Sequence, residues 1–145
     1  MTTTRRARRA LSLTGAALIA GAAGIHVLWA TGSAWPARDR RELAEVVAGA
    51  DEFPGPVACV AVASLLAGAA VVVGAGDDGR VARTGRAGVA GVFAVRGLAG
   101  LAAGTGKLVP WTPSDRFVRV DRRVYSPLCL TIAALVLAGA PRARR

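Results

Sequence analysis

The sequence predicts an all-α fold: an integral membrane four-helix bundle with short interfacial helices in its two outer loops. Of the 145 residues, 53% are hydrophobic, only 5% are aromatic and 18 are glycine. Alanine, valine, leucine and glycine make a thin core for a soluble protein, but they suit close helix packing in lipid. The second observation is that four apolar stretches come near the roughly 20 residues that a helix needs to cross a bilayer.

The four expected spans lie near residues 11–31, 56–76, 87–106 and 125–141, within one domain over residues 1–145. The third is interrupted by Arg96, and the other three contain no charged residue. Gly100 and Gly104, at four-residue spacing, predict close helix packing there. The first span follows a basic segment, as a signal sequence would, but its apolar part of about 20 residues exceeds the usual 7–15. We therefore expect an uncleaved anchor.

The basic residues predict the orientation. With the N-terminus inside, the cytoplasmic segments carry ten Lys and Arg residues and the outer loops carry eight. Basic residues beside the first span usually weigh most, and four arginines precede Leu11. We therefore expect a multi-pass protein of the bacterial plasma membrane with both termini in the cytoplasm.

Each outer loop is expected to contain a short helix that lies in the interface. In the first loop, Asp39 and Glu42 have the spacing of a capping box. In the second, Thr112 is expected to cap a helix that has Pro113 at its first position. Ser126-Pro127 is expected to begin the last span in the same way.

The stretch from Gly24 to Pro36 holds the only histidine and two of the three tryptophans. His26 lies about 7 Å below the outer end of the first span, and Trp29 shares its helix face. An imidazole inside a span is either hydrogen-bonded to a neighbouring helix or part of a functional site. Trp29 and Trp35 fit either an aromatic belt at the headgroups or the lining of that site.

Arg96 is the tenth residue of the third expected span. Arginine near the bilayer centre costs about 2.5–3.5 kcal/mol on translocon scales, and no expected span contains Asp or Glu. The guanidinium therefore needs carbonyls and water, a loop carboxylate such as Asp51, Asp115 or Asp121, or an anionic ligand.

Cys59 and Cys129 lie at similar depths in their spans, which would allow their sulfurs to meet. They are therefore expected either to form a disulfide or to remain two buried thiols. A zinc site with His26 would lack a fourth ligand, and one axial histidine is weak support for haem. We expect no metal and no cofactor. The sequence contains no glycine-rich phosphate loop, nucleophile elbow or paired intramembrane carboxylates.

The formal net charge of +10 does not indicate nucleic acid, because the arginines form short clusters between apolar runs. A small multidrug exporter, also built from four helices, depends on a glutamate in its first span. Residues 11–31 contain no carboxylate, which argues against that class.

Two blocks, "IHVLWATGSAWP" and "FVRVDRRVYSPLCL", resemble those of the domain-of-unknown-function 3995 family of small bacterial four-span membrane proteins. The resemblance covers nearly the whole chain and implies a four-helix integral membrane protein, but no activity. Both blocks fall on the side that the charge count assigns to the outside, which puts Asp121, Arg122 and Tyr125 on the same face as His26.

The sequence thus predicts a membrane protein of uncharacterised and non-catalytic role, with the bilayer as its surroundings and its oligomeric state left open. An outer-face pocket would take a lipid-like or anionic small molecule or a partner helix. The alternative is a membrane oxidoreductase that uses a quinone-like carrier with Cys59 and Cys129. The residues expected to line the pocket are His26, Trp29, Trp35, Arg96, Asp121, Arg122 and Tyr125.

Overall fold

The computed structural model describes residues 2–75, 79–102, 105, 109 and 111–140, and every regular element within these ranges is helical. The all-α prediction is therefore confirmed. Between α1 and α3 lie the short helix α2 and the π-helical turn η1; α5, the π-helical turn η3 and α6 form one continuous helix. The bounds are α1 Thr2–Ala30, α2 Arg40–Leu43, η1 Ala44–Ala48, α3 Pro56–Gly74, α4 Arg80–Leu101, α5 Asp115–Val120, η3 Asp121–Tyr125 and α6 Ser126–Gly139.

Within the part of the chain that the structure describes, three helical segments are long and apolar enough to cross a membrane: Thr3–Ala30, Pro56–Gly74 and Asp115–Gly139. Helix α4 has 22 residues but carries four arginines, so a fourth span stays a prediction. Large apolar side chains point outward, as in Leu65 of α3, which is 75% exposed, and Val92 of α4, which is 70% exposed. Such surfaces are stable in lipid and costly in water.

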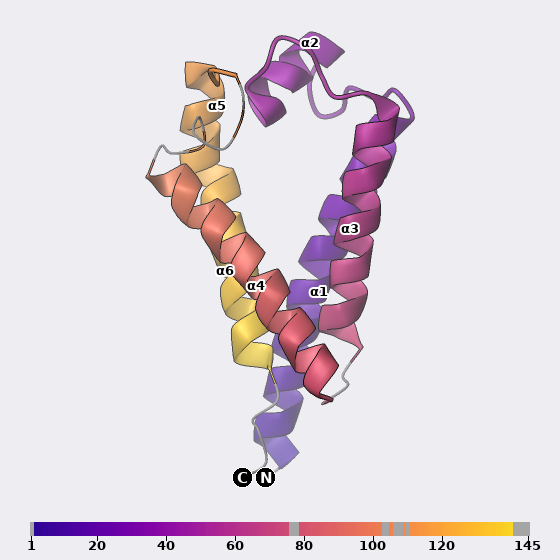
Figure 1. Cartoon of the computed structure of the whole chain (residues 1–145), viewed down its shortest axis with the longest axis vertical. Helices are drawn as coiled ribbons and strands as arrows, with labels where there is room; N and C mark the ends of the chain where they lie inside the picture. The colour runs from indigo at the N-terminus through magenta and orange to yellow at the C-terminus, as the bar shows by residue number, and fades with distance from the viewer. Residues whose placement is uncertain (1, 76–78, 103–104, 106–108, 110, 141–145) are drawn as a thin grey trace.

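The helices pack as two pairs, α1 beside α3 and α4 beside α6 (Figure 1). The pairs converge where α1 begins and α6 ends, which we call the terminal end, and diverge towards α2 and α5, which we call the loop end. All four helices meet in one core cluster: Ala16, Ile19, Val73, Ala90, Ile132 and Val136. A second cluster of Trp29, Leu43 and Cys59 joins only α1, α2 and α3.

Half of the capping box predicted at α2 is confirmed: the Glu42 N–H donates to Asp39 Oδ1 at 2.8 Å, while the Glu42 carboxylate accepts from the Arg38 N–H at 3.0 Å. The prediction that Thr112 caps the next helix was wrong. Ser114 is the cap, and its Oγ accepts from the Phe117 N–H at 3.1 Å. The cap moves because residues 112–114 are not helical, and the Ser114 N–H donates to Gly49 O of the other loop-end segment at 3.2 Å.

The last helical segment, α6, begins at Ser126 with Pro127 in its first turn, as predicted, but Ser126 does not cap it, because the helix continues without a break from α5 through η3. Pro127 has no N–H for the carbonyl four residues earlier, and a proline inside a helix disturbs the hydrogen bonds before it. The turn η3 directly precedes it, with the Ser126 N–H donating to Asp121 O, five residues back. A π-turn before the proline thus lets the helix continue.

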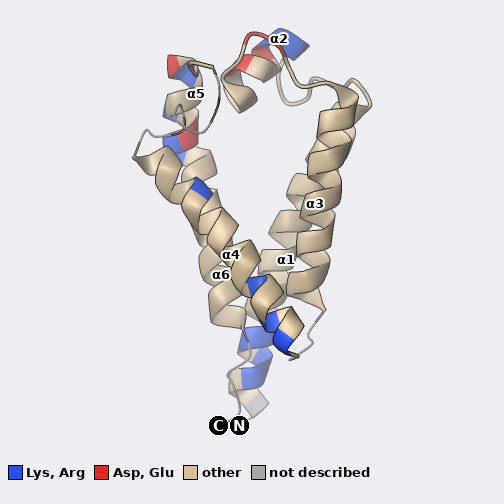
Figure 2. Ribbon diagram, viewed as in Figure 1, with Lys and Arg blue, Asp and Glu red and all other residues tan. Residues whose placement is uncertain are grey.

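The two ends differ in charge (Figure 2). At the terminal end the described charged residues are all arginines, on the first turns of α1 and of α4. The segment between α3 and α4 also contains Asp77 and Asp78, which lie outside the described residues. Every acidic residue that the structure describes belongs to the loop end, where basic residues accompany them.

Candidate functional site

The most buried charged group at the loop end is the Asp121 carboxylate, whose side chain is 1% exposed. Arg96 binds it through both terminal nitrogens, with Nη2 to Oδ1 at 2.8 Å and Nη1 to Oδ2 at 3.3 Å. Thr105 Oγ1 donates to Oδ2 at 2.7 Å and Ser126 Oγ donates to Oδ1 at 3.2 Å. Four hydrogen bonds therefore stabilise the buried negative charge.

These four residues, the Arg96–Asp121 cluster, come together because glycine lets α4 approach the last helix closely. A Cβ on Gly100 would collide with Ser126 Oγ and would lie 2.7 Å from Asp121 Oδ2. A Cβ on Gly97 would lie 2.9 Å from the Ser126 carbonyl oxygen. The packing expected at Gly100 is thus present, while Gly104 lies outside the described residues.

The structure places Arg96 nearer the end of its helix than the expected span did. Helix α4 starts at Arg80 and ends at Leu101, so Arg96 lies about 8 Å before its last residue. Of the three loop carboxylates considered as counterions, the structure selects Asp121. The Arg96 side chain keeps 33% exposure. A guanidinium has five N–H donors, so the two bonds to Asp121 leave donors for another acceptor.

His26 and Trp29 belong to the other helix pair. His26 Nδ1 donates to the Ala22 carbonyl at 2.8 Å, so its partner lies in its own helix, and its ring meets Trp29 edge-on at 4.9 Å. Trp29 is only 6% exposed and donates through Nε1 to the Trp35 carbonyl at 2.7 Å. Trp35 itself is 59% exposed.

Arg40, which the sequence analysis did not single out, fixes this corner. Its guanidinium lies over the Phe53 ring at 4.8 Å from the centroid, and Nη1 donates to the Trp29 carbonyl at 3.0 Å. Phe53 in turn meets Trp29 edge-on at 5.4 Å. The signal in the sequence was weak, because Arg40 lies in a cluster of loop arginines.

The expected lining residues thus fall into two groups on separate helix pairs, which diverge at this end (Figure 1). His26, Trp29 and Trp35 gather near α1, while Arg96 and Asp121 join α4 to η3. Tyr125 reaches across, because its hydroxyl donates to the Val46 carbonyl of η1 at 3.4 Å. Arg122 is exposed.

The two cysteines are free thiols. Cys59 on α3 is buried beside Trp29 and Leu43 and its Sγ donates to the Pro54 carbonyl at 3.7 Å. Cys129 lies on α6, in the other helix pair, and is partly buried. Among the described residues, no group of three or more His, Cys, Asp and Glu side chains could hold a metal ion.

Two salt bridges join the loop-end segments across the gap between the helix pairs. Arg116 Nη2 lies 2.9 Å from Glu42 Oε1, and Arg116 Nη1 lies 3.7 Å from Glu45 Oε2. The N–H of Arg38 and then the Arg116 guanidinium lower the pKa of Glu42 below its ordinary value. Trp111 Nε1 donates to the Ala48 carbonyl at 3.1 Å and strengthens the same link.

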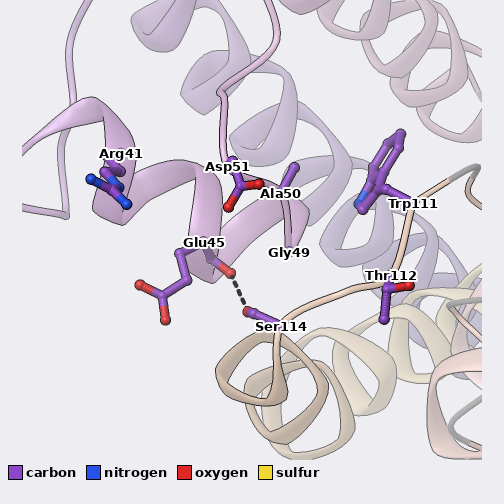
Figure 3. A pocket seen from close by; sticks show the side chains of 8 residues that line it. All are labelled: Arg41, Glu45, Gly49, Ala50, Asp51, Trp111, Thr112 and Ser114. Atoms are coloured by element: carbon purple, nitrogen blue, oxygen red, sulfur yellow. Dashed lines mark hydrogen bonds between the residues drawn. The ribbon is translucent and has the colours of Figure 1, made fainter.

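A cavity of about 400 Å³ opens beside this link (Figure 3). It combines charges of both signs with an indole and hydroxyl groups, and none of its residues was expected to bind a ligand. Ser114 Oγ donates to the Glu45 carbonyl at its edge. The lining residues are Arg41, Glu45, Gly49, Ala50, Asp51, Trp111, Thr112 and Ser114.

Comparison with known proteins identifies a family for this chain. The family model for proteins of unknown function named DUF3995 matches residues 16–136, which include all of the Arg96–Asp121 cluster. No curated protein and no solved structure matches the chain. With most of its length matched, the chain belongs to the DUF3995 family.

Proposed function

We propose that this chain is a non-catalytic protein of the bacterial plasma membrane that binds a lipid-like or anionic molecule at its loop end. In this proposal, α4 is a fourth span and both termini lie in the cytoplasm. The arginines of the terminal end, beside the first expected span, support that orientation. The loop end then faces the outside.

The observation that carries the proposal is the state of Arg96. Its charge is balanced by Asp121, yet a third of its side chain remains exposed beside apolar helix surfaces. The buried carboxylate already holds the guanidinium in one orientation. The arginine side chain would therefore lose little further conformational entropy when it donates to a ligand oxygen. A phosphate or carboxylate with an apolar body suits such a place, because its body can lie along the helices.

The cavity of about 400 Å³ gives the loop end a second feature that suits a polar headgroup, although Arg96 does not line it. Its lining combines Arg41 with the carboxylates of Glu45 and Asp51, so a polar headgroup would meet partners of either charge. It lies where the loop-end segments meet, towards which the helix pairs diverge. A lipid-like molecule would place its polar part there and its apolar part between or along the helices.

The test is native mass spectrometry of the full chain extracted in mild detergent. Removing Arg96 alone would leave a buried carboxylate, so the variant is the double substitution Arg96→Gln/Asp121→Asn, which keeps hydrogen-bonding groups. The matched control is Arg119→Gln, an exposed arginine on α5.

We expect wild type and control to retain an adduct of defined mass. The double variant should lose it by at least about tenfold in occupancy, as expected for a charged hydrogen bond of about 1.5–3 kcal/mol. Equal adducts in all three proteins, or no adduct in wild type, would refute the proposal.

A further inference from the structure

The terminal end contains a second cavity, between α4 and α6, of about 120 Å³. Two of its lining residues are arginines on one face of α4, since Arg83 and Arg86 are three positions apart. The remaining four, Ala87, Val136, Leu137 and Ala140, are apolar. The cavity thus has a cationic wall and an apolar wall.

The two arginines differ in exposure, so one lies in the interior of the cavity and the other lies at the surface. Arg86 is 3% exposed, whereas Arg83 is exposed. Both lie in the first two turns of a 22-residue helix, where the positive end of the helix dipole adds to their charge. A negatively charged group in the cavity would therefore meet two guanidinium groups and a favourable dipole.

Two more arginines at this end, on α1, bind backbone carbonyls. Arg8 Nη1 donates to the Ala140 carbonyl at 3.1 Å, and Arg9 Nη1 donates to the Gly74 carbonyl at 2.7 Å. These contacts stabilise the last carbonyls of α6 and α3, as basic side chains near helix C-termini commonly do. Neither Arg8 nor Arg9 lines the cavity.

The size of the cavity indicates what part of a ligand it takes. Pockets that enclose a drug-sized molecule measure about 300–1,000 Å³, so a cavity of about 120 Å³ has room for a single small group. Leu137, in its wall, is 59% exposed on the outer surface of α6. A ligand can therefore place a charged group inside and leave an apolar part along the helices.

We infer that this cavity binds the phosphate of an anionic phospholipid from the leaflet that surrounds the terminal end. Basic pockets between membrane helices are suited to such headgroups, because basic side chains near the membrane surface attract anionic lipids. The site is separate from the loop-end site, because it lies at the opposite end of the helices and shares no residue with it.

The experiment measures lipid binding to the delipidated full chain in detergent by native mass spectrometry. Phosphatidylglycerol is compared with phosphatidylcholine of the same acyl chains, and inorganic phosphate is added as a competitor. The variants are Arg83→Gln and Arg86→Lys. The second keeps the positive charge of the buried side chain but removes the planar guanidinium with its paired N–H donors. The matched control is Arg80→Gln, an exposed arginine of the same helix turn that does not line the cavity.

We expect phosphatidylglycerol to bind at least about tenfold more tightly than phosphatidylcholine, and both Arg83→Gln and Arg86→Lys to weaken it by about tenfold. Arg80→Gln should change it by less than about threefold, as for an exposed charge. Equal binding of the two lipids, or equal losses in Arg83→Gln and Arg80→Gln, would overturn the inference. Displacement by inorganic phosphate as effective as that by the lipid would show a free phosphate site instead.

The double variant Arg96→Gln/Asp121→Asn separates this inference from the proposed function. It should lose the loop-end adduct and keep its preference for phosphatidylglycerol. Loss of that preference in this variant would contradict the assignment to Arg83 and Arg86.

Discussion

Substituting Arg96 by methionine should destabilise the protein more than substituting Asp121 by asparagine. Methionine leaves the Asp121 carboxylate buried at 1% exposure, with only the hydroxyls of Thr105 and Ser126 as donors. Asparagine instead leaves the Arg96 guanidinium, whose side chain is 33% exposed and can reach water or headgroups. The two halves of one salt bridge therefore have different costs.

The magnitudes follow from this difference in burial. Removing one partner of a buried ion pair costs about 3–5 kcal/mol. The hydroxyls of Thr105 and Ser126 still bind the carboxylate after Arg96 is removed, so we expect the lower end of that range. We expect a loss of about 3 kcal/mol for Arg96→Met and about 1 kcal/mol for Asp121→Asn.

A double-mutant cycle in detergent micelles tests these values, with unfolding followed by circular dichroism. The double variant Arg96→Met/Asp121→Asn should be more stable than Arg96→Met alone, because the buried charge is gone. The reasoning would be refuted if Asp121→Asn were the more destabilising single variant, or if the double variant were no more stable than Arg96→Met.

Three further predictions concern other contacts. Gly100→Ala should lower the free energy of unfolding by about 1–3 kcal/mol, because the added Cβ would meet Ser126 and Asp121. The control Gly91→Ala, whose Cβ would have nothing within 4 Å, should be neutral or stabilising in the same unfolding assay. Equal effects of the two substitutions would exclude the close approach of α4 to the last helix at Gly100. The lowered pKa of Glu42 means that its carboxylate stabilises the fold above its ordinary pKa and stops doing so as the pH falls through the lowered value. The difference in Tm between wild type and Glu42→Gln should therefore be present at neutral pH and vanish in acid, and a difference independent of pH would contradict this assignment. A membrane-permeant maleimide should alkylate the partly buried Cys129 faster than Cys59, which is 3% exposed, as measured by mass spectrometry of single-cysteine variants; a faster reaction at Cys59 would show that the Trp29 cluster opens.

The sequence by itself determined the helical class, the apolar helices and the two kinds of end. Apolar runs of nearly 20 residues, separated by short charged segments, leave few other folds because backbone groups in lipid must bond within a helix. The Asp39 cap of α2 was also readable, because both partners lie within one turn. Local hydrogen bonding and hydropathy need no knowledge of neighbours.

Helix starts were less predictable where a distant contact or a proline intervened. Thr112 and Ser114 are equally good caps by type, and the choice depends on Gly49, far away in the chain. Ser126-Pro127 has the composition of a helix start, but the chain passes it with a π-turn and continues. Sequence patterns report what a residue permits, not which option the fold selects.

The candidate site was decided by tertiary structure. The sequence named three carboxylates that could neutralise Arg96, and only the packing of α4 against η3, allowed by Gly100, selects Asp121 and adds Thr105. The pairing of helices also put His26 and Arg96 on different helix pairs, although both were expected to line one outer-face pocket. Depth along a helix follows from the sequence, whereas rotation and neighbours depend on side chains that meet only in the folded bundle.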